Sequence, residues 1–173
     1  LNLNEKYNPL FSSDCRYFII TGGRGSGKSF AVTVFLTLLT MSKNIRVLFT
    51  RYTMVSAHLS IIPEFLEKIS LLGYENIFSV NKAEVVNLKN KSDILFRGIK
   101  TSAGNQTASL KSLTGVSNWV LDEAEELIDE NIFDTIDLSI REKNIQNRVI
   151  LILNPVTKEH WIYNRFFQDK GVQ

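Results

Sequence analysis

GGRGSGKS, residues Gly22 to Ser29, is the stretch that decides the fold. It matches G-x-x-x-x-G-K-[ST], the Walker A pattern, in which glycines let backbone N–H groups wrap the phosphates of a nucleotide. Lys28 is expected to reach the β- and γ-phosphates, and the Ser29 hydroxyl to ligate Mg²⁺. ATP and Mg²⁺ are therefore the predicted cofactors. The predicted nucleotide-binding residues are Gly22, Gly23, Arg24, Gly25, Ser26, Gly27, Lys28 and Ser29.

The segments on either side of this loop have the pattern that the motif requires. Arg16–Thr21 is a short run of aromatic and β-branched residues that stops at glycines, which predicts a buried strand. Lys28–Met41 continues an apolar pattern without Gly or Pro, which predicts a helix. A glycine-rich turn without function would require neither neighbour, so the sequence favours a phosphate-binding loop.

The rest of the chain alternates short apolar runs with helical patterns. Strands are predicted at Ile45–Thr50, Ile77–Val80, Glu84–Leu88, Asp93–Arg97, Asn118–Leu121 and Arg148–Leu153, and helices at Val55–Leu72, Glu125–Arg141 and His160–Phe167. Pro63 is expected to start a second helical segment, because proline is tolerated in the first turn of a helix. The turn Lys89-Asn90-Lys91 predicts a hairpin, and the polar segment Gly98–Ser109 predicts a surface loop. The predicted fold is α/β, with a mostly parallel central sheet flanked by helices and an added antiparallel hairpin.

Asn118-Trp119-Val120-Leu121-Asp122-Glu123 has the pattern of a Walker B strand. An acid at the carboxyl end of a strand beside the Walker A strand can hold Mg²⁺, which makes Asp122 a predicted metal ligand together with Ser29. Glu123 would orient and polarise the attacking water. Paired acids also occur at plain helix N-termini, but the Walker A loop upstream favours the catalytic interpretation. A solvated helix face is expected for the later acids Glu125, Glu126, Asp129 and Glu130.

Two further positions stay open on the residues alone. Arg24, inside the phosphate loop, could stabilise charge developing on the γ-phosphate as an arginine finger does, or it could be a surface arginine at a variable loop position. Asn154 follows the strand Arg148–Leu153, where a polar residue could lie beside Walker B and sense the γ-phosphate. Pro155 next to it favours a plain turn.

The composition narrows the class of protein. The chain has 173 residues, of which 44% are hydrophobic and 22% charged, which suits one folded domain. A net charge of +2 gives no electrostatic indication of a nucleic-acid partner. One cysteine and two distant histidines argue against disulfides and structural zinc and suit a reducing cytoplasm. The longest apolar stretch, Phe30–Met41, is too short to span a bilayer, so no membrane association is expected.

Taken together, these motifs resemble the N-terminal ATPase domain of the large terminase subunit of tailed bacteriophages. Walker A alone is shared by many NTPases, whereas its combination with Asp122-Glu123-Ala124-Glu125-Glu126 and Asn154-Pro155 is more specific. The arginine in this Walker A loop is one that many terminases have. Further segments in the family's order are Asn8–Phe11, Arg16–Phe18, Thr50–Arg51, Phe96–Gly98, Lys111–Leu113 and His160–Trp161.

The resemblance implies a RecA-like, additional-strand P-loop NTPase, whose ATP hydrolysis powers translocation of double-stranded viral DNA into a procapsid. It implies Glu123 as catalytic glutamate, Arg24 as a cis arginine finger and Asn154 as the coupling residue. With Lys28, these residues are the expected catalytic set. Arg141 is a weaker candidate for a finger, acting on a neighbouring subunit.

The same resemblance implies partners and a location. The expected partners are double-stranded DNA, the portal protein and the small terminase subunit, with a homo-oligomeric ring on the procapsid and a monomer in isolation. The host bacterial cytoplasm is the expected location. Terminases usually carry a C-terminal nuclease domain, and residues 1–173 are expected to form the ATPase domain without nuclease activity. Loop Gly98–Ser109 or the hairpin is the candidate contact to DNA or to a neighbouring subunit.

Other nucleotide-dependent classes have weaker support. Asn81-Lys82-Ala83-Glu84 resembles the guanine-binding N-K-x-D of GTPases, but it precedes Walker B and ends in Glu, and no D-x-x-G follows. A helicase or another additional-strand ATPase acting on nucleic acid is the main alternative, although neither a Ser-Ala-Thr motif nor an upstream adenine-binding glutamine is visible. A nucleotide-binding switch that barely hydrolyses ATP also stays open. A small-molecule kinase would need a substrate pocket and lid, of which the sequence gives no specific sign.

Overall fold

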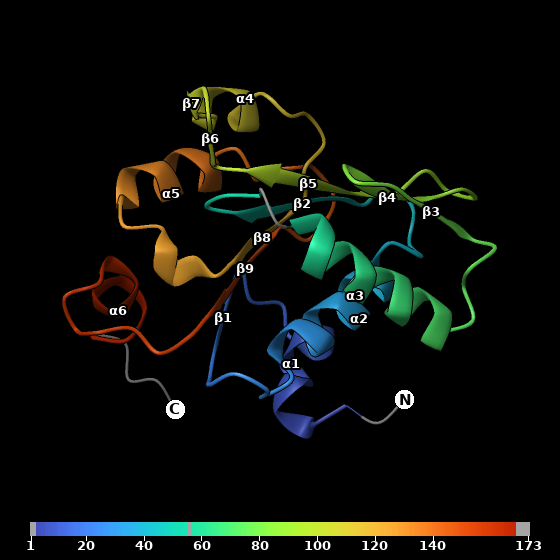
Figure 1. Ribbon diagram of the computed structural model, residues 1–173, viewed down its shortest axis with the longest axis horizontal. Coiled ribbons are helices and arrows are strands. Elements are labelled where there is room, and N and C mark those ends of the chain that lie inside the picture. The colour runs from blue at the N-terminus through green and yellow to red at the C-terminus, as the bar shows by residue number, and fades with distance from the viewer. Residues whose placement is uncertain (1–2, 55–56, 169–173) are drawn as a thin grey trace.

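The computed structural model describes residues 3–54 and 57–168, which form one large sheet with helices on both faces (Figure 1). The seven strands of this sheet have the order β1-β9-β8-β2-β5-β4-β3. The strands β1, β9, β8, β2 and β5 run parallel to one another. At the other end of the sheet, β4 pairs antiparallel with β5, and β3 pairs antiparallel with β4. The seven strands are β1 (Tyr17–Thr21), β2 (Arg46–Arg51), β3 (Phe78–Val80), β4 (Glu84–Asn87), β5 (Asp93–Gly98), β8 (Asn118–Asp122) and β9 (Arg148–Leu153).

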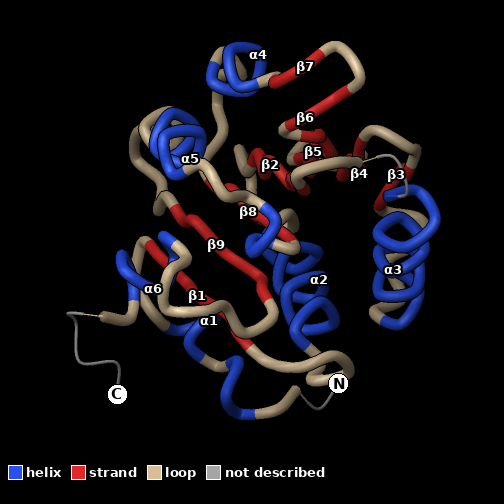
Figure 2. The backbone as a smooth tube through the Cα atoms, turned by 60° about the vertical axis from the view of Figure 1, so that its left-hand side comes forward, coloured by secondary structure: helices blue, strands red, loops and turns tan. Residues whose placement is uncertain are grey.

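The helices divide between the two faces of this sheet (Figures 1 and 2). One face carries α1 (Pro9–Ser12), α2 (Lys28–Leu39) and α3 (Ala57–Leu71), and the other α4 (Thr107–Lys111), α5 (Glu130–Asp137) and α6 (Trp161–Phe166). The described residues also form two 3-10 turns, η1 (Glu5–Tyr7) and η2 (Ala124–Glu126). No helix in the described part of the chain is both long and apolar enough to cross a bilayer.

The strand order brings the two nucleotide motifs to one edge of the sheet. β1 leads into the Walker A loop and β8 ends at Asp122, and the carboxyl ends of parallel strands meet at the same edge. The expectation that the Walker B strand lies directly beside the Walker A strand is wrong, because β9 pairs with both and lies between them. This inserted strand is the feature that defines the additional-strand class. The mostly parallel sheet with an added antiparallel hairpin is confirmed.

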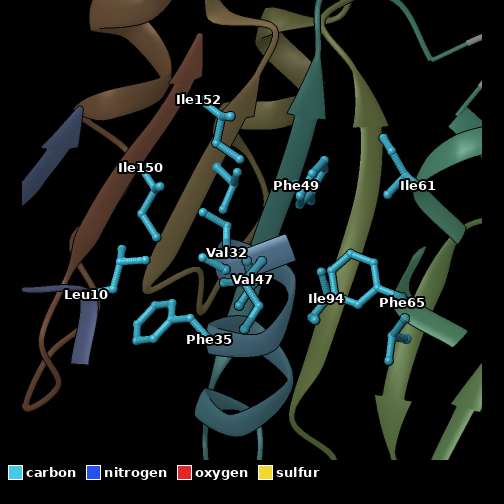
Figure 3. Packing of buried hydrophobic residues seen from close by; sticks show 14 of the residues in the cluster. Leu10, Val32, Phe35, Val47, Phe49, Ile61, Phe65, Ile94, Ile150 and Ile152 are labelled. Carbon is cyan, nitrogen blue, oxygen red and sulfur yellow. The ribbon is translucent and has the colours of Figure 1, made fainter. Parts of the chain in front are cut away.

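Alternate residues of the central strands supply two separate cores. Val120 of β8 belongs to the core beneath α2 and α3, whereas Trp119 and Leu121 belong to the core beneath α5 and α6. Figure 3 shows the first core, in which Phe35 of α2 and Phe65 of α3 pack against strand residues. Burying a side chain of this size contributes about 1.5–3 kcal/mol relative to leaving it exposed. The two cores fix the sheet between its helical layers.

α2 is buried on nearly all sides, because it lies between the sheet and its neighbours α1 and α3. Every residue from Ala31 to Thr37 is buried. The hydroxyls of Thr37 and Thr40 donate to the carbonyl oxygens of Thr33 and Leu36 at 2.8 and 3.0 Å, so no hydroxyl of this pair loses its hydrogen bond on burial. The helix that begins at the phosphate loop is therefore anchored in the core.

α3 runs through Pro63 without a break, which contradicts the expected second segment. Proline inside a helix removes one backbone hydrogen bond and costs about 3 kcal/mol. Ile61, Phe65 and Ile69 lie four residues apart on one side of the helix and are all buried in the first core. Packing of this apolar face offsets the cost of the proline, which sequence pattern alone did not reveal.

Two segments differ from the prediction: the expected loop contains regular secondary structure, and the expected long helix is shorter. The predicted loop 98–109 contains the small hairpin β6 (Lys100–Thr101) and β7 (Gly104–Asn105), and α4 begins at Thr107. The predicted helix 125–141 is reduced to η2 and α5. Leu127 interrupts it, because its side chain is fully buried in an extended backbone conformation, and Asp129 then caps α5 through the N–H of Asn131 at 2.9 Å.

Candidate nucleotide-binding site

The phosphate loop turns tightly between β1 and α2. Gly25 and Gly27 have φ angles of 75° and 81°, in the left-handed region that side chains other than glycine rarely adopt. Gly27 caps α2, and its carbonyl oxygen accepts the N–H of Ala31 at 3.0 Å. The free N–H groups of the first turn of α2 therefore begin at the loop, where the positive end of the helix dipole favours phosphate.

Lys28 folds back over its own loop. Its ammonium donates to the carbonyl oxygens of Gly22 and of Gly23, the latter at 3.0 Å. A second brace comes from the N-terminal segment, where the Tyr7 hydroxyl donates to the carbonyl oxygen of Ser26 at 2.8 Å. Tyr7 is not among the residues predicted to bind nucleotide. No motif marks it, because the contact spans 19 positions of the chain.

One cavity of about 420 Å³ brings the two motifs together. The predicted catalytic residues Arg24, Lys28, Glu123 and Asn154 all line it, as do the predicted Mg²⁺ ligands Ser29 and Asp122. Gly22 and Gly23 hold the Lys28 ammonium through their carbonyl oxygens. The lining residues are Arg24, Gly25, Ser26, Gly27, Lys28, Ser29, Phe30, Arg51, Glu64, Asp122, Glu123, Glu125, Ile152, Leu153 and Asn154.

The oxygen atoms of Ser29 and Asp122 suit a magnesium ion that is held partly by the phosphates of a nucleotide. Mg²⁺ binds through one or two protein oxygens together with substrate phosphates and water, without a cage of protein ligands. No group of three or more His, Cys, Asp or Glu side chains able to hold a metal occurs among residues 3–54 and 57–168. Ser29 offers a hydroxyl and Asp122 a carboxylate to the same cavity, so the residues present fit a metal that binds together with its nucleotide.

Arg51 pairs with both Walker B acids. It ends β2, the strand next to β8, and its guanidinium lies 2.7 Å from the Asp122 carboxylate and 3.6 Å from that of Glu123. The Asp122 side chain is 6% exposed, so this cation balances a charge that water barely reaches. Sequence motifs identified Thr50–Arg51 only as a family segment. The pairing of β2 with β8 gives Arg51 its place in the site.

Glu123 stands at a sharp turn of the backbone. Its φ and ψ angles of 53° and 46° are left-handed, an uncommon conformation for a residue with a side chain and one that concentrates at functional sites. Partial burial raises the pKa of the Glu123 carboxyl above its ordinary value, while Arg51 lowers it and the Asp122 charge raises it again. A carboxylate with a raised pKa is a better proton acceptor, which suits a group that polarises water.

A further part of the cavity lining comes from α3. Glu64 is half-buried there, and its burial raises the pKa of its carboxyl, with Lys68 lowering it and Asp122 raising it further. The Lys68 ammonium lies 4.5 Å from the centre of the Phe30 ring, which also lines the cavity. Glu64 is a site residue that sequence reasoning missed, because it lies far from both motifs in an ordinary helical pattern.

Glu125 contradicts the expectation of a solvated helix face. It lies in η2, lines the nucleotide cavity, and accepts a hydrogen bond from the Asn154 side chain at 2.7 Å. The segment forms a 3-10 turn here, and this turn packs against β9, which places Glu125 beside Asn154. Asn154 therefore forms part of the cavity wall, whereas Pro155 next to it favoured a plain turn at this position.

The two candidate arginine fingers lie at different places. Arg24 lines the nucleotide cavity of its own chain. Arg141 instead lines a separate cavity together with Lys111, Glu142 and residues 112–116, which precede β8. Arg141 thus lies near the amino ends of the strands, away from its own nucleotide site.

Comparison with known proteins identifies the family. The family model described as phage terminase large subunit matches residues 14–173. The chain belongs to this family.

Relatives of the terminase family support this assignment over nearly the whole chain. The terminase large subunit of Bacillus phage SPP1 is 24% identical over an aligned length of 188 residues, and the alignment covers 98% of this chain and 43% of that protein. The chain thus spans less than half the length of this curated relative. The large terminase from a thermophilic bacteriophage superposes with a TM-score of 0.76 at 13% identity, covering 96% of this chain and 42% of that one, and its ADP complex superposes with 0.73.

A third structure broadens the comparison. The viral genome packaging motor assembly of bacteriophage Phi-29 superposes with a TM-score of 0.67 at 16% identity, covering 95% of this chain and 50% of that chain. At these identities the structural matches establish the fold, which is the additional-strand terminase ATPase fold expected from the motifs.

Proposed function

We propose that this terminase chain hydrolyses ATP with Mg²⁺ and thereby drives double-stranded viral DNA into a procapsid. The observation that carries the proposal is the convergence of Lys28, Ser29, Asp122, Glu123 and Asn154 on one cavity at the carboxyl edge of the sheet. Family membership supports the same reaction, and the large terminase from the thermophilic bacteriophage is known in complex with ADP. Helicase-like ATPases share the fold class, but nothing in the site favours them over a packaging motor.

Each part of the reaction has a residue suited to it. The N–H groups at the start of α2 and the Lys28 ammonium would hold the phosphates, and Ser29 and Asp122 would hold Mg²⁺. Held there, Mg²⁺ would supply positive charge to neutralise the phosphate oxygens. Glu123, with its raised pKa, would accept a proton from the attacking water. Arg24 lines the same cavity, where it can stabilise charge that develops on the γ-phosphate.

The β6–β7 hairpin is the proposed contact to DNA. Lys100 is exposed on it, and its ammonium lies 5.8 Å from the centre of the Tyr52 ring. The N–H groups of Ile99 and Lys100 donate to the carbonyl oxygens of Arg51 and Tyr52 at 3.0 and 2.7 Å. A displacement of the hairpin would therefore act on the residue that pairs with Asp122. Alanine at Lys100 is expected to weaken stimulation of hydrolysis by DNA, and unchanged stimulation would count against this contact.

The assembly is part of the proposal. We infer a homo-oligomeric ring on the procapsid that contacts the portal protein and the small terminase subunit in the host cytoplasm, with a monomer in isolation. We also infer that residues 1–173 act as the ATPase unit without nuclease activity. Incubating the chain with plasmid DNA and a divalent metal tests the last point, because cleavage above a metal-free control would contradict it.

Phosphate release tests the main proposal. The chain is assayed with Mg²⁺ and ATP, alone and with double-stranded DNA, beside Lys28→Ala and Glu123→Ala. Lys28→Ala is expected to weaken ATP binding by about a hundredfold, as expected for loss of a charge-assisted contact to phosphate. Lys43→Ala, an exposed lysine outside the cavity lining, is the matched control and should bind normally. Background release that Glu123→Ala leaves unchanged would exclude the enzyme and favour a nucleotide-binding switch.

A further inference from the structure

Glu125 and Asn154 form a pair at the edge of the nucleotide cavity. The Glu125 Oε1 atom accepts a hydrogen bond of 2.7 Å from Asn154 Nδ2, and both residues line the cavity. They come from different elements, since Glu125 lies in η2 after the Walker B acids and Asn154 follows β9. The pair thus joins the two segments that leave β8 and β9 on the side of the nucleotide.

A carboxylate partner fixes the orientation of the Asn154 amide. The side-chain amide can present either its NH₂ group or its oxygen to a neighbour, and the neighbour decides which. Ionised Glu125 can only accept, so it holds the NH₂ group of Asn154 toward itself. The second N–H and the amide oxygen then point in defined directions. A glutamine at 125 would remove this constraint, because its own amide both donates and accepts.

The backbone that presents Glu125 is held at two points. His160 Nδ1 accepts the N–H of Ile162 at 3.2 Å, so Nε2 carries the proton and donates to the Glu125 carbonyl oxygen at 3.1 Å. The indole N–H of Trp161 donates to the carbonyl oxygen of Leu127 at 2.5 Å. The turn η2 is therefore tied to the start of α6. This rigidity lets a single side chain place Asn154 accurately.

Fold stability does not account for a glutamate at this position. The second carboxylate oxygen, Oε2, is buried and has no hydrogen-bond partner among the described residues. An unpaired charged oxygen in a buried place is unfavourable for folding. A glutamine would fill the same volume without the charge, so the native side chain points to a function in the site.

We propose that Glu125 is a positioning residue, which orients Asn154 so that its amide contacts the γ-phosphate of bound ATP. The inference rests on the proposed function, since it requires ATP in this cavity. It assigns Glu125 a role that differs from those of Asp122 and Glu123, because Glu125 acts through another side chain. The consequence is selectivity: Glu125 helps the chain to distinguish a triphosphate from a diphosphate.

Nucleotide binding tests the proposal without turnover. Dissociation constants for ATPγS and for ADP, each with Mg²⁺, are measured for the native chain and for Glu125→Gln. The variant is expected to bind ATPγS about tenfold to a hundredfold more weakly, as for loss of one hydrogen bond to a charged group, with ADP affinity within about twofold. Glu126→Gln is the matched control, because it makes the same change on the adjacent exposed residue and should leave both constants unchanged.

A double mutant separates positioning from a merely structural role. If Glu125 acts through Asn154, Glu125→Gln should add nothing to the loss of triphosphate preference in Asn154→Ala. Thermal unfolding of Glu125→Gln should occur at or above the native temperature, because the variant relieves an unpaired charge. Additive effects, equal weakening toward ADP, or an unchanged preference for ATPγS would each overturn the inference. If the native chain itself binds neither nucleotide, the proposed function fails instead.

Discussion

Arg51 Nε donates to Asp122 Oδ2 at 2.8 Å, and the Nη2 atom of the same guanidinium lies 2.7 Å from the same oxygen. The pair bridges neighbouring strands, because β2 ends at Arg51 and β8 at Asp122. Oδ1 takes no part in the pair. One oxygen of the carboxylate therefore pairs with the arginine, and the other would stay available to hold Mg²⁺. Arg51 thus balances the buried charge of Asp122, the proposed metal ligand, while contacting only one of its two carboxylate oxygens.

Removing Arg51 should destabilise the chain at neutral pH. Arg51→Ala leaves Asp122 buried without its cation, and breaking a buried pair in this way costs about 3–5 kcal/mol. Urea unfolding measures the loss. The control is Arg165→Ala, whose ion pairs with Glu130 and Asp134 lie at the surface and should contribute about 1 kcal/mol or less. Equal losses of unfolding free energy in the two variants would mean that water solvates the Asp122 carboxylate well enough for it to need no cation.

Turnover should depend on the ionisation of Glu123. Burial raises the pKa of this carboxyl, so the acid limb of the pH–rate profile should lie above the ordinary titration range of a glutamate. Glu123→Gln should reduce hydrolysis by about a hundredfold or more and should abolish that limb, since an amide accepts no proton at these pH values. The same variant should still bind ATPγS. An acid limb that survives in Glu123→Gln would assign the titration to another group.

Glu64 should lower stability at neutral pH. Its folded-state pKa is raised, so the folded chain holds the proton more tightly than the unfolded chain, and stability decreases as the pH rises through the folded-state pKa. Glu64→Gln should therefore unfold at a higher temperature at pH 7 and show little difference from the native chain at pH 4. Glu5→Gln is the control, because Glu5 is exposed, whereas Glu67 on the same helix as Glu64 pairs with the buried Lys68 at 2.9 Å. A lower melting temperature for Glu64→Gln at pH 7 would show that the Lys68 attraction outweighs burial.

A buried hydrogen-bond chain should fix the pairing of β2 with β8. The Trp119 indole N–H donates to the Thr50 hydroxyl at 2.9 Å, and that hydroxyl donates to the carbonyl oxygen of Val120 at 3.0 Å. Thr50→Val removes both bonds and leaves the indole N–H unpaired, at an expected cost of about 2–3 kcal/mol. Trp119→Phe removes one bond together with some packing. Chemical denaturation of the two single variants and the double variant should show non-additive losses. Simple addition would contradict a shared network.

Local sequence features were enough to predict much of the fold and part of the site. The strand before Gly22, the helix after it, and the parallel sheet with its hairpin follow from apolar periodicity and glycine positions, which are short-range properties of the chain. Lys28, Ser29, Asp122 and Glu123 were predicted in the same way, because motif spacing reflects how a loop and a strand end can meet phosphate and metal. All four line one cavity.

What only the tertiary structure decided is which distant residues meet. The insertion of β9 between β1 and β8 determines that Asn154 joins the site, and the pairing of β2 with β8 brings Arg51 to Asp122. Glu125 changed from an expected surface acid to the partner of Asn154, because burial of Leu127 shortens the helix to a 3-10 turn. Strand order and such interruptions depend on packing energies summed over the whole core. A short stretch of sequence does not determine these packing energies, because they depend on residues far apart in the chain. The phosphate loop, in contrast, is specified by eight adjacent residues.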